Sequence, residues 1–318
     1  ALPFPASDDP WLETLRAAVP SLASPSPPSP RFERPGSLEG VFARLAASPG
    51  AVLIAGGTDL MVYANQRYER WPALVSLEGV PELRDFTVED GAMVIGAGVP
   101  LAAIEERLRG TGAAPALEAL LPLFSSRLIR NRATLGGSLV TASPIGDAAP
   151  VLLALDADVV IASAAGMRRL PLTDFFVGYR KTVLAPGDVV VSVHLPLPAP
   201  RHQRFYKVSK RVMDDISTVA AAFALDLDGE GRVARLRAAF GGVAATPVRA
   251  LDAERAAVGR RWDAETIAAL GPALDALGTP MTDHRGSAAY RRAMPRRLLE
   301  RFFFEVKTAE APAGEARP

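Results

Sequence analysis

The chain has 318 residues, enough for two domains or for one large domain with a smaller companion. A hydrophobic content of 49% can build real cores, which argues against a chain that is disordered throughout. Because Lys and Arg (36) nearly balance Asp and Glu (35), the net charge is only +1, and neither nucleic acid nor an acidic membrane is indicated as a partner.

Cysteine is absent and the three histidines are scattered, so the sequence offers few of the side chains that bind transition metals. Disulfides, thiol nucleophiles, zinc–cysteine sites and iron–sulfur ligation are therefore excluded from this chain. No metal site is predicted, and no apolar run is long enough to cross a bilayer. The lack of cysteine is compatible with a cytoplasmic location, which we expect.

Prolines dominate the N-terminal stretch and predict an extended linker over residues 1–34, interrupted by a short helix at residues 11–19. Two interpretations of this linker remain open: a frayed terminus, and a tether to a preceding domain. The globular pattern begins at residue 35.

Apolar residues at helical spacing open the globular part. Leu38, Val41, Phe42 and Leu45 fall on one helical face, and Ser37 is a suitable N-cap. Two short strands then predict a βαβ-like unit, and Asp-Gly predicts a hairpin turn. In chain order, the expected elements are strands at 51–54 and 73–77, a hairpin over 86–99, helices at 101–108 and 116–123, and strands at 159–162 and 189–195.

The proline-rich residues 196–200 predict a boundary between a first domain (35–200) and a second domain (201–308), which a tail (309–318) follows. Hairpins are mixed with crossovers in this pattern, which favours the α+β class over a regular doubly wound sheet. In the second domain we expect a hairpin of strands 216–227 and 233–240, then helices at 247–258, 264–277 and 287–306, the last kinked or broken at Pro295.

Residues 53–60 lead from a strand into a glycine pair. Gly56 and Gly57 lack Cβ atoms, so backbone N–H groups can approach a phosphate closely, and Thr58 offers a further donor. An ordinary tight turn is the alternative explanation, because glycine turns are common. The segment is neither the G-x-G-x-x-G fingerprint nor a P-loop.

Residues 130–147 contain a second glycine pair, Gly136 and Gly137, flanked by hydroxyl residues. Small residues and hydroxyls are too dense here for a core strand or a stable helix, so a loop folded around a polar ligand is predicted. Two such segments suit a pyrophosphate held from two sides. Asp147 is then placed to accept from a ribose or ribityl hydroxyl.

A third candidate segment covers residues 205–216. Lys207 follows a strand-like approach, and charged residues cluster at 210–215. A solvated charged loop is the ordinary explanation of such a cluster.

Together these segments resemble the FAD-binding subunit or domain of the molybdenum hydroxylase family. The likeness covers residues 35–308 and looks closest to the xanthine dehydrogenase branch, in which an iron–sulfur domain precedes the flavin domain. Ser138 stands where Asn is usual, and Met213 where an acidic or polar residue is common. The matching residues are Ile54-Ala-Gly-Gly-Thr-Asp59, Ile129-Arg-Asn-Arg-Ala-Thr-Leu-Gly-Gly-Ser138, Ala142-Ser-Pro-Ile-Gly-Asp147, Lys207-Val-Ser-Lys-Arg211, Asp214-Asp-Ile216, Phe240-Gly-Gly-Val243 and Ser287-Ala-Ala-Tyr-Arg291.

The resemblance implies an FAD-binding domain of two α+β subdomains, followed by a C-terminal α+β domain. It implies FAD as the cofactor, with Phe124 stacking near the flavin ring, Val190 touching it through its backbone, and Lys207 bonding its polar edge. No residue is assigned a catalytic role. The implied FAD-binding residues are Leu53, Ile54, Ala55, Gly56, Gly57, Thr58, Asp59, Leu60, Phe124, Thr134, Leu135, Gly136, Gly137, Ser138, Thr141, Asp147, Val190 and Lys207.

The resemblance also implies a path for electrons. They reach FAD from a molybdenum cofactor and [2Fe–2S] clusters, which we expect on partner chains or on an N-terminal domain outside this sequence, and a hydride then passes to NAD⁺. The expected partners are a molybdenum-cofactor-binding large subunit and an iron–sulfur domain or subunit, in a cytoplasmic hetero-oligomer of purine metabolism. The loop at 210–215 is expected to govern access of NAD⁺.

Two alternatives stay open. One is the flavin subunit of another molybdenum hydroxylase, of the CO dehydrogenase, aldehyde or aromatic-acyl type, with a different acceptor. The other is a non-catalytic structural module whose flavin site has decayed. The intact glycine pairs and Asp147 argue against the second.

Overall fold

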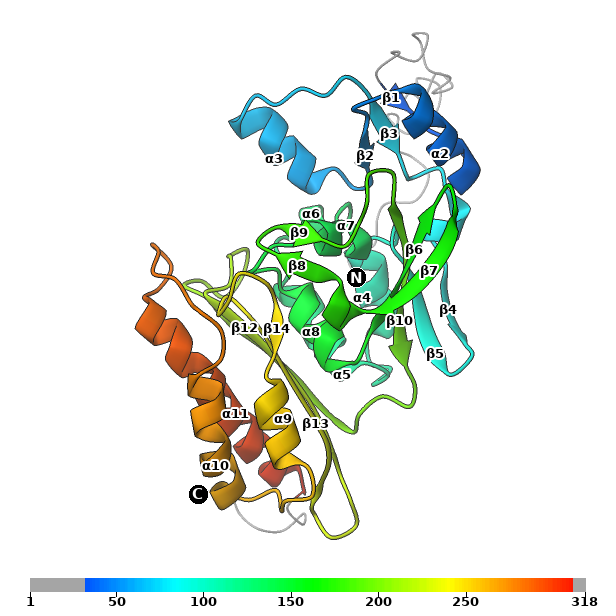
Figure 1. The fold of residues 1–318 in the computed structure, drawn as a ribbon. Coiled ribbons are helices and arrows are strands. Elements are labelled where there is room, and N and C mark those ends of the chain that lie inside the picture. Colours follow the sequence, from blue (N-terminus) through cyan, green and yellow to red (C-terminus); the bar gives the residue numbers. More distant parts are fainter. Residues whose placement is uncertain (1–31, 311–318) are drawn as a thin grey trace, which may run out of the picture.

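In the computed structural model, which describes residues 32–310, three β-sheets of three or more strands follow one another from the top to the bottom of Figure 1, and a fourth has only two strands. Parallel strands joined by a crossover occur in the first sheet, and antiparallel hairpins build the other two. This mixture confirms the α+β class. The helix predicted at residues 11–19 lies outside the described residues.

The first sheet is small, parallel and ordered β1-β3-β2. Its elements are β1 (Phe32–Glu33), α2 (Leu38–Ala47), β2 (Val52–Ile54), α3 (Thr58–Gln66) and β3 (Leu74–Ser76). The Ser37 Oγ atom accepts a hydrogen bond from Gly40 N at 3.1 Å and so caps α2, as predicted. The crossover from β2 to β3 through α3 confirms the βαβ-like unit. β1 lies before residue 35, within the range predicted as linker.

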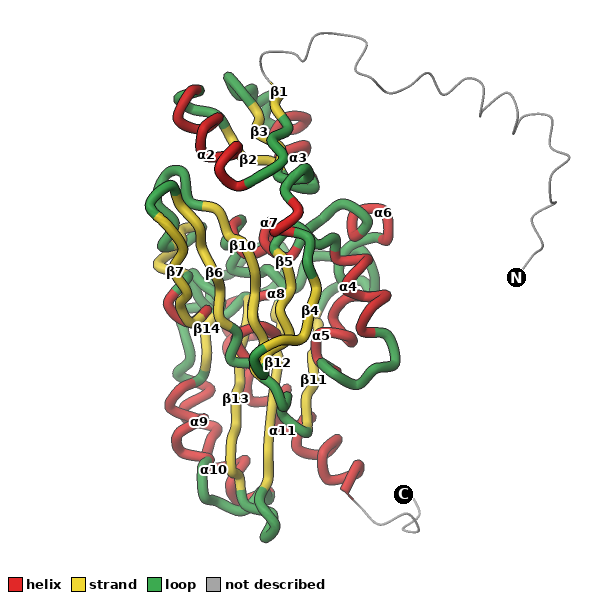
Figure 2. The backbone as a smooth tube through the Cα atoms, turned by 90° about the vertical axis from the view of Figure 1, so that its right-hand side faces the viewer, coloured by secondary structure: helices red, strands yellow, loops and turns green. Residues whose placement is uncertain are grey.

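The second sheet has five antiparallel strands in the order β4-β5-β10-β6-β7. Figure 2 shows these strands side by side with helices next to them. Every second residue along a strand points to the same face, and on one face residues such as Ile95, Val159 and Val193 belong to a core that also includes residues of the helices. Its elements are β4 (Phe86–Glu89), β5 (Ala92–Gly96), α4 (Leu101–Leu108), α5 (Pro115–Leu120), α6 (Arg127–Arg130), α7 (Leu135–Val140), α8 (Ala148–Ala154), β6 (Asp158–Ser163), β7 (Gly166–Pro171), the small pair β8 (Phe176–Gly178) and β9 (Lys181–Thr182), and β10 (Val189–Pro196), with 3₁₀ turns η1 (Pro81–Leu83), η2 (Leu121–Leu123) and η3 (Leu172–Asp174).

The third sheet has the order β11-β12-β13-β14, and its neighbouring strands are antiparallel. Its elements are β11 (His202–Val208), β12 (Val219–Leu227), β13 (Val233–Gly241), β14 (Val248–Arg249), α9 (Leu251–Ala257), α10 (Ala264–Asp275) and α11 (Ala288–Glu310). Helices α9, α10 and α11 cover one face, whereas α5 and α8 pack on the other face.

Strand β12 shows why the second and third sheets are held together. Ala220, Ala222 and Ala224 belong to the core shared with the second sheet, while Phe223 and Leu225 belong to the core beneath α9, α10 and α11. The small alanine side chains let α5 and α8 approach the sheet closely. A shared core of this kind fixes the relative position of the two regions.

Three local predictions are wrong. Residues 130–147 are not one loop, because Thr134 Oγ1 accepts from Gly137 N at 3.1 Å and Leu139 is buried, which stabilises the short helix α7. The helix predicted from residue 247 begins only at Leu251, since Val248–Arg249 pairs with β13 instead. The strand predicted from residue 216 begins at Val219.

Helix α11 is continuous through Pro295, so of the two expected outcomes, a kink or a break, the break does not occur. Proline removes one backbone donor, a local cost. The helix nevertheless runs for 23 residues. Its own Leu298, Leu299 and Phe302 side chains are buried in the core of the second domain, and this tertiary packing outweighs the lost hydrogen bond. Over residues 32–310, no helix combines the length and apolarity that a membrane crossing requires.

Candidate functional site

The loop between β2 and α3 presents a run of free backbone donors. Gly57 has a left-handed φ of 75° and directly precedes α3. Within the part of the chain that the structure describes, the N–H groups of residues 56–60 have no hydrogen-bond acceptor; the next residue, Met61, donates to Gly57 O. We call residues 56–60 the cradle. A helix N-terminus with several converging free N–H groups is a binding site for a phosphate.

Residue 56 must be glycine, because its backbone lies very close to the segment before α7. A Cβ atom placed on Gly56 would lie 1.8 Å from Arg132 O and 2.4 Å from Arg132 C. The Arg132 guanidinium also forms an ion pair with Glu78, just after β3. These contacts dock the two glycine-bearing segments onto each other.

The second glycine pair plays a different part. Gly136 N donates to Ala97 O, and Gly137 N to the Thr134 hydroxyl, so neither donor is free for a ligand. A Cβ atom on Gly136 would lie 2.6 Å from Ala97 Cβ, so this glycine serves close packing against Ala97, the residue just after β5. The segment meets the cradle through a side chain, because Thr141 Oγ1 donates to Asp59 Oδ2 at 2.7 Å.

Thr141→Val should weaken cofactor binding, because it removes the hydroxyl that links α7 to the first turn of α3. The expected loss of FAD affinity is about five- to tenfold, the net size of one ordinary intramolecular hydrogen bond. Equilibrium titration with FAD measures it. Thr308→Val is the matched control, since Thr308 also bonds the carbonyl four residues earlier, but among residues 32–310 its hydroxyl has no carboxylate partner. Equal affinities for both variants would contradict the link.

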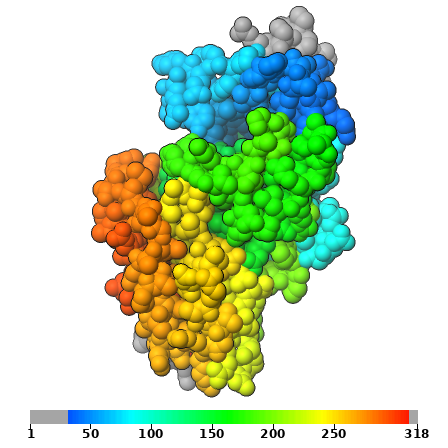
Figure 3. Space-filling view, viewed as in Figure 1, coloured from blue at the N-terminus to red at the C-terminus, as the bar shows by residue number. Residues whose placement is uncertain are grey.

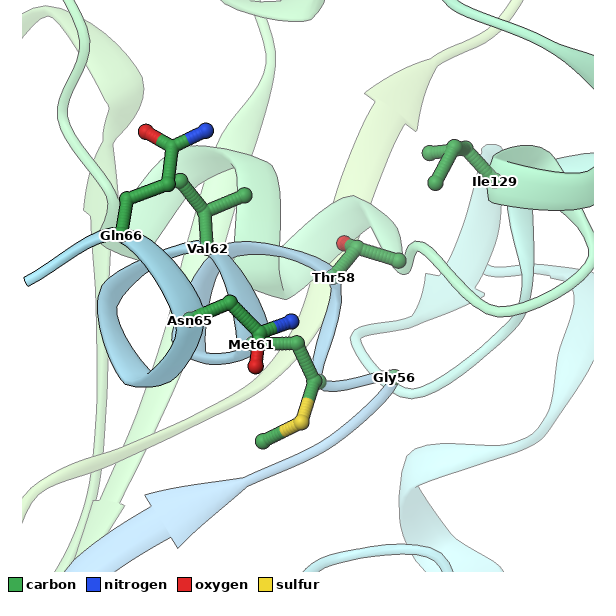
Figure 4. A pocket seen from close by; sticks show the side chains of 8 residues that line it. Gly56, Thr58, Met61, Val62, Asn65, Gln66 and Ile129 are labelled. Atoms are coloured by element: carbon green, nitrogen blue, oxygen red, sulfur yellow. The ribbon is translucent and has the colours of Figure 1, made fainter. Parts of the chain in front are cut away.

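A groove of about 360 Å³ lies beside the cradle (Figure 4). Helix α3 supplies one wall and Ile129 of α6 lies opposite. No residue of α3 is buried, and the helix lies on the surface in Figure 3. The lining residues are Gly56, Gly57, Thr58, Met61, Val62, Asn65, Gln66 and Ile129.

Asp147 and Lys207 form a buried ion pair across the two regions of the chain. Lys207 Nζ lies 2.8 Å from Asp147 Oδ2, and their side chains are 4% and 8% exposed. The Ser217 hydroxyl donates to the other carboxylate oxygen at 2.5 Å. Burial raises the pKa of the Asp147 carboxyl above its usual range, against the opposing influence of Lys207 and Ser217.

The turn that precedes α6 lies beside this ion pair. Lys207 Nζ also donates to Leu123 O at 3.0 Å, and Arg130 Nη1 donates to Phe124 O at 3.0 Å. Arg130 is 5% exposed. Phe124 itself is partly buried and packs against the main core.

The charged loop at residues 210–215 is largely exposed, as in the ordinary explanation, but it also touches this turn. Asp214 and Ser125 both have left-handed φ values, of 50° and 47°, and the Ser125 hydroxyl donates to Asp214 Oδ1 at 3.1 Å. Two non-glycine residues in this region, bonded to each other, mark a strained junction at the site.

The structure brings most of the predicted residues into two linked groups. Leu53, Ile54 and Ala55 lead into the cradle with Thr58, Asp59 and Leu60, and Thr141, which caps the C-terminus of α7, bonds Asp59. Thr134 caps the N-terminus of α7, and Ser138 lies within that helix. Phe124, Asp147 and Lys207 form the second group. Leu135, Gly136 and Val190 are instead buried in the core. Sequence reasoning missed Arg130, although it stands within the quoted Ile129-Arg-Asn-Arg motif, and Ser217, for which the sequence carries no signal.

The arrangement suits the binding of a ligand that carries a phosphate. The cradle fits the phosphate, the groove beside it offers apolar side chains, and the second group contains the buried ion pair. Among residues 32–310, no group of three His, Cys, Asp or Glu side chains is placed to hold a metal ion.

Comparison with known proteins matches both halves of the chain. Residues 28–198 match the family of the FAD binding domain in molybdopterin dehydrogenase, and residues 204–306 match the CO dehydrogenase flavoprotein C-terminal domain. The xanthine dehydrogenase FAD-binding subunit of Escherichia coli O157:H7 is 30% identical, over 87% of this chain and 96% of its own. Xanthine dehydrogenase of Emericella nidulans is 32% identical, but the chain spans only 21% of its length.

Solved structures share the fold along nearly their whole length. Quinoline 2-oxidoreductase from Pseudomonas putida 86 superposes with a TM-score of 0.80 and 31% identity, over 88% of this chain and 97% of that chain. Carbon monoxide dehydrogenase from Hydrogenophaga pseudoflava gives a TM-score of 0.80 at 28% identity, over 87% and 96%. The chain therefore belongs to the molybdenum hydroxylase family as a flavoprotein component, an FAD-binding domain followed by a CO dehydrogenase flavoprotein C-terminal domain.

Proposed function

We propose that the chain is the electron-transfer flavoprotein of a xanthine dehydrogenase-type molybdenum hydroxylase, which takes electrons from iron–sulfur clusters and uses NAD⁺ as the acceptor. The observation that carries the proposal is the run of unpaired N–H groups at residues 56–60, beside a groove and joined to a second polar segment. FAD supplies the redox chemistry when it is bound, and the residues of this chain bind and orient it.

The residues present suit the two halves of the cofactor. The cradle and Thr141 would hold the pyrophosphate, and the segment at 134–138 would support it. Lys207 uses two of its three N–H donors within the protein, so one donor remains for the polar edge of the flavin. Asp147 keeps lone pairs that can accept from a cofactor hydroxyl, with Phe124 stacking near the ring and Val190 contacting it through its backbone.

The remaining expectations concern context. We propose domain boundaries near residues 35, 200 and 308, with residues 1–34 as a linker. The E. coli relative, which this chain covers almost completely, is described as a subunit, and this favours a hetero-oligomer with a molybdenum-cofactor-binding chain and an iron–sulfur domain or subunit. A cytoplasmic location and a role in purine metabolism belong to the same proposal.

A second candidate is the flavoprotein of a hydroxylase for another substrate. Nicotinate hydroxylase of Emericella nidulans is 32% identical, as close as the fungal xanthine dehydrogenase. A decayed structural module is disfavoured, because the donors of the cradle remain free.

NADH tests the acceptor. Anaerobic mixing of the FAD-loaded chain with NADH should bleach the flavin much faster than it bleaches free FAD, because hydride transfer between bound flavin and nicotinamide is reversible. Loss of the visible absorption is followed by stopped flow. A flavin that dithionite reduces but NADH does not would contradict NAD⁺ as acceptor and favour the second candidate.

A further inference from the structure

The turn at residues 122–125 has all four of its carbonyl groups bonded to buried cations. Arg130 Nη1 donates to Pro122 O at 3.4 Å, to Phe124 O at 3.0 Å and to Ser125 O at 3.2 Å. Lys207 Nζ donates to the remaining carbonyl, Leu123 O, at 3.0 Å. We call this arrangement the carbonyl clamp. Its two cations come from different regions of the chain, Arg130 from α6 and Lys207 from β11.

Arg130 is fixed in place on its other side. Its Nε atom donates to Glu105 Oε2 at 3.0 Å, and the Glu105 side chain is 10% exposed. A buried Arg–Glu pair adds little net stability over apolar residues of similar size, because both charges lose their hydration. What this pair does provide is a fixed guanidinium whose Nη1 atom points into the turn, where its two N–H groups are shared among three carbonyl oxygens.

The carbonyl clamp holds a strained segment of backbone. Ser125 has a left-handed φ of 47°, which costs on the order of 1 kcal/mol or more for a residue with a side chain. Phe124 directly precedes this strained residue and is only partly buried, so its ring position follows from the backbone of the turn. Ser125 in turn bonds Asp214 of the charged loop.

We propose that Arg130 is a positioning residue that sets the orientation of Phe124 toward the flavin through the carbonyl clamp, without contacting the cofactor itself. This inference rests on the proposed function, since it takes Phe124 as the aromatic neighbour of the flavin. It goes beyond that function because Arg130, a buried cation that is not among the proposed FAD-binding residues, would control the geometry of the flavin site.

The test compares Arg130→Gln, Phe124→Leu and their double variant by flavin fluorescence, visible circular dichroism and FAD titration. Arg130→Gln should bind FAD roughly tenfold more weakly and change both optical signals in the direction of Phe124→Leu. Because both substitutions act through one ring, the double variant should show no further change beyond Phe124→Leu. Additive changes, or an Arg130→Gln variant with the optical signals of the parent chain, would overturn the proposal.

Two further variants keep the test decisive. Arg127→Gln is the matched control, because Arg127 lies on the same helix and is 3.5 Å from Glu105, yet its side chain is 45% exposed; its optical signals should match the parent chain. If Arg130→Gln does not fold, Arg130→Lys takes its place: it keeps the charge but is shorter and lacks the Nε–H that bonds Glu105, so an intermediate optical change is expected. A parent chain that takes up no FAD would instead defeat the proposed function and leave the carbonyl clamp a purely structural feature.

Discussion

Gly56→Ala is expected to abolish most FAD binding while leaving the rest of the chain folded. The added Cβ atom would lie 1.8 Å from Arg132 O, so the loop before α3 must move away from the segment before α7. Forcing a methyl group into such a contact costs roughly 1–3 kcal/mol, which corresponds to a loss of about ten- to hundredfold in FAD affinity if the cradle absorbs the strain. Equilibrium dialysis against FAD measures the loss.

Gly36→Ala is the matched control for this substitution. It makes the same chemical change, but a Cβ atom on Gly36 meets nothing within 4 Å. Its FAD affinity and its thermal unfolding should equal those of the parent chain. If Gly56→Ala bound FAD as tightly as Gly36→Ala, the cradle would not be the phosphate site.

Lys207→Met should destabilise the fold itself, by about 3–5 kcal/mol, because it leaves the buried Asp147 carboxylate without its cation. Met nearly matches the length of the lost side chain, so the effect is electrostatic rather than a cavity. The same substitution removes the bond to Leu123 O and should weaken FAD binding. Chemical denaturation followed by far-ultraviolet circular dichroism gives the free energy of unfolding.

The double variant Lys207→Met with Asp147→Asn separates charge from packing. An amide needs no cation, so the double variant should recover more than half of the lost stability, although not the FAD affinity. A double variant as unstable as Lys207→Met alone would mean that packing at β11, and not the ion pair, holds the two regions together.

Some features of the first sheet and of the cradle could be predicted from the sequence because their causes are local. Ser37 caps α2, and the glycine pair at 56–57 follows a short strand, since both depend on neighbours a few residues away. The family motifs also identified which segments belong to the expected FAD site and the order in which they follow one another. The prediction of a loop folded around a ligand at Gly136-Gly137 was wrong in its secondary structure, because a single cap by Thr134 and two buried leucines are enough for a short helix.

Contacts between segments far apart in the chain could not be predicted from the sequence. Asp147 and Lys207 were both predicted to face the cofactor, and their bond to each other across 60 residues has no local signal. The same holds for Gly56: position 56 needs a glycine because a Cβ atom there would collide with the carbonyl oxygen of Arg132. Arg130 could be seen in a motif, but three backbone carbonyls as its partners cannot be read from side-chain types.

The visible spectrum of the purified chain, together with identification of the flavin released on denaturation, tests the central claim most directly. The predicted result is one FAD per chain. Gly56→Ala should lose most of its FAD, in line with its weaker affinity, whereas Gly36→Ala should keep it. A colourless chain that takes up no added FAD would contradict the claim, since the free donors of residues 56–60 would then serve no flavin.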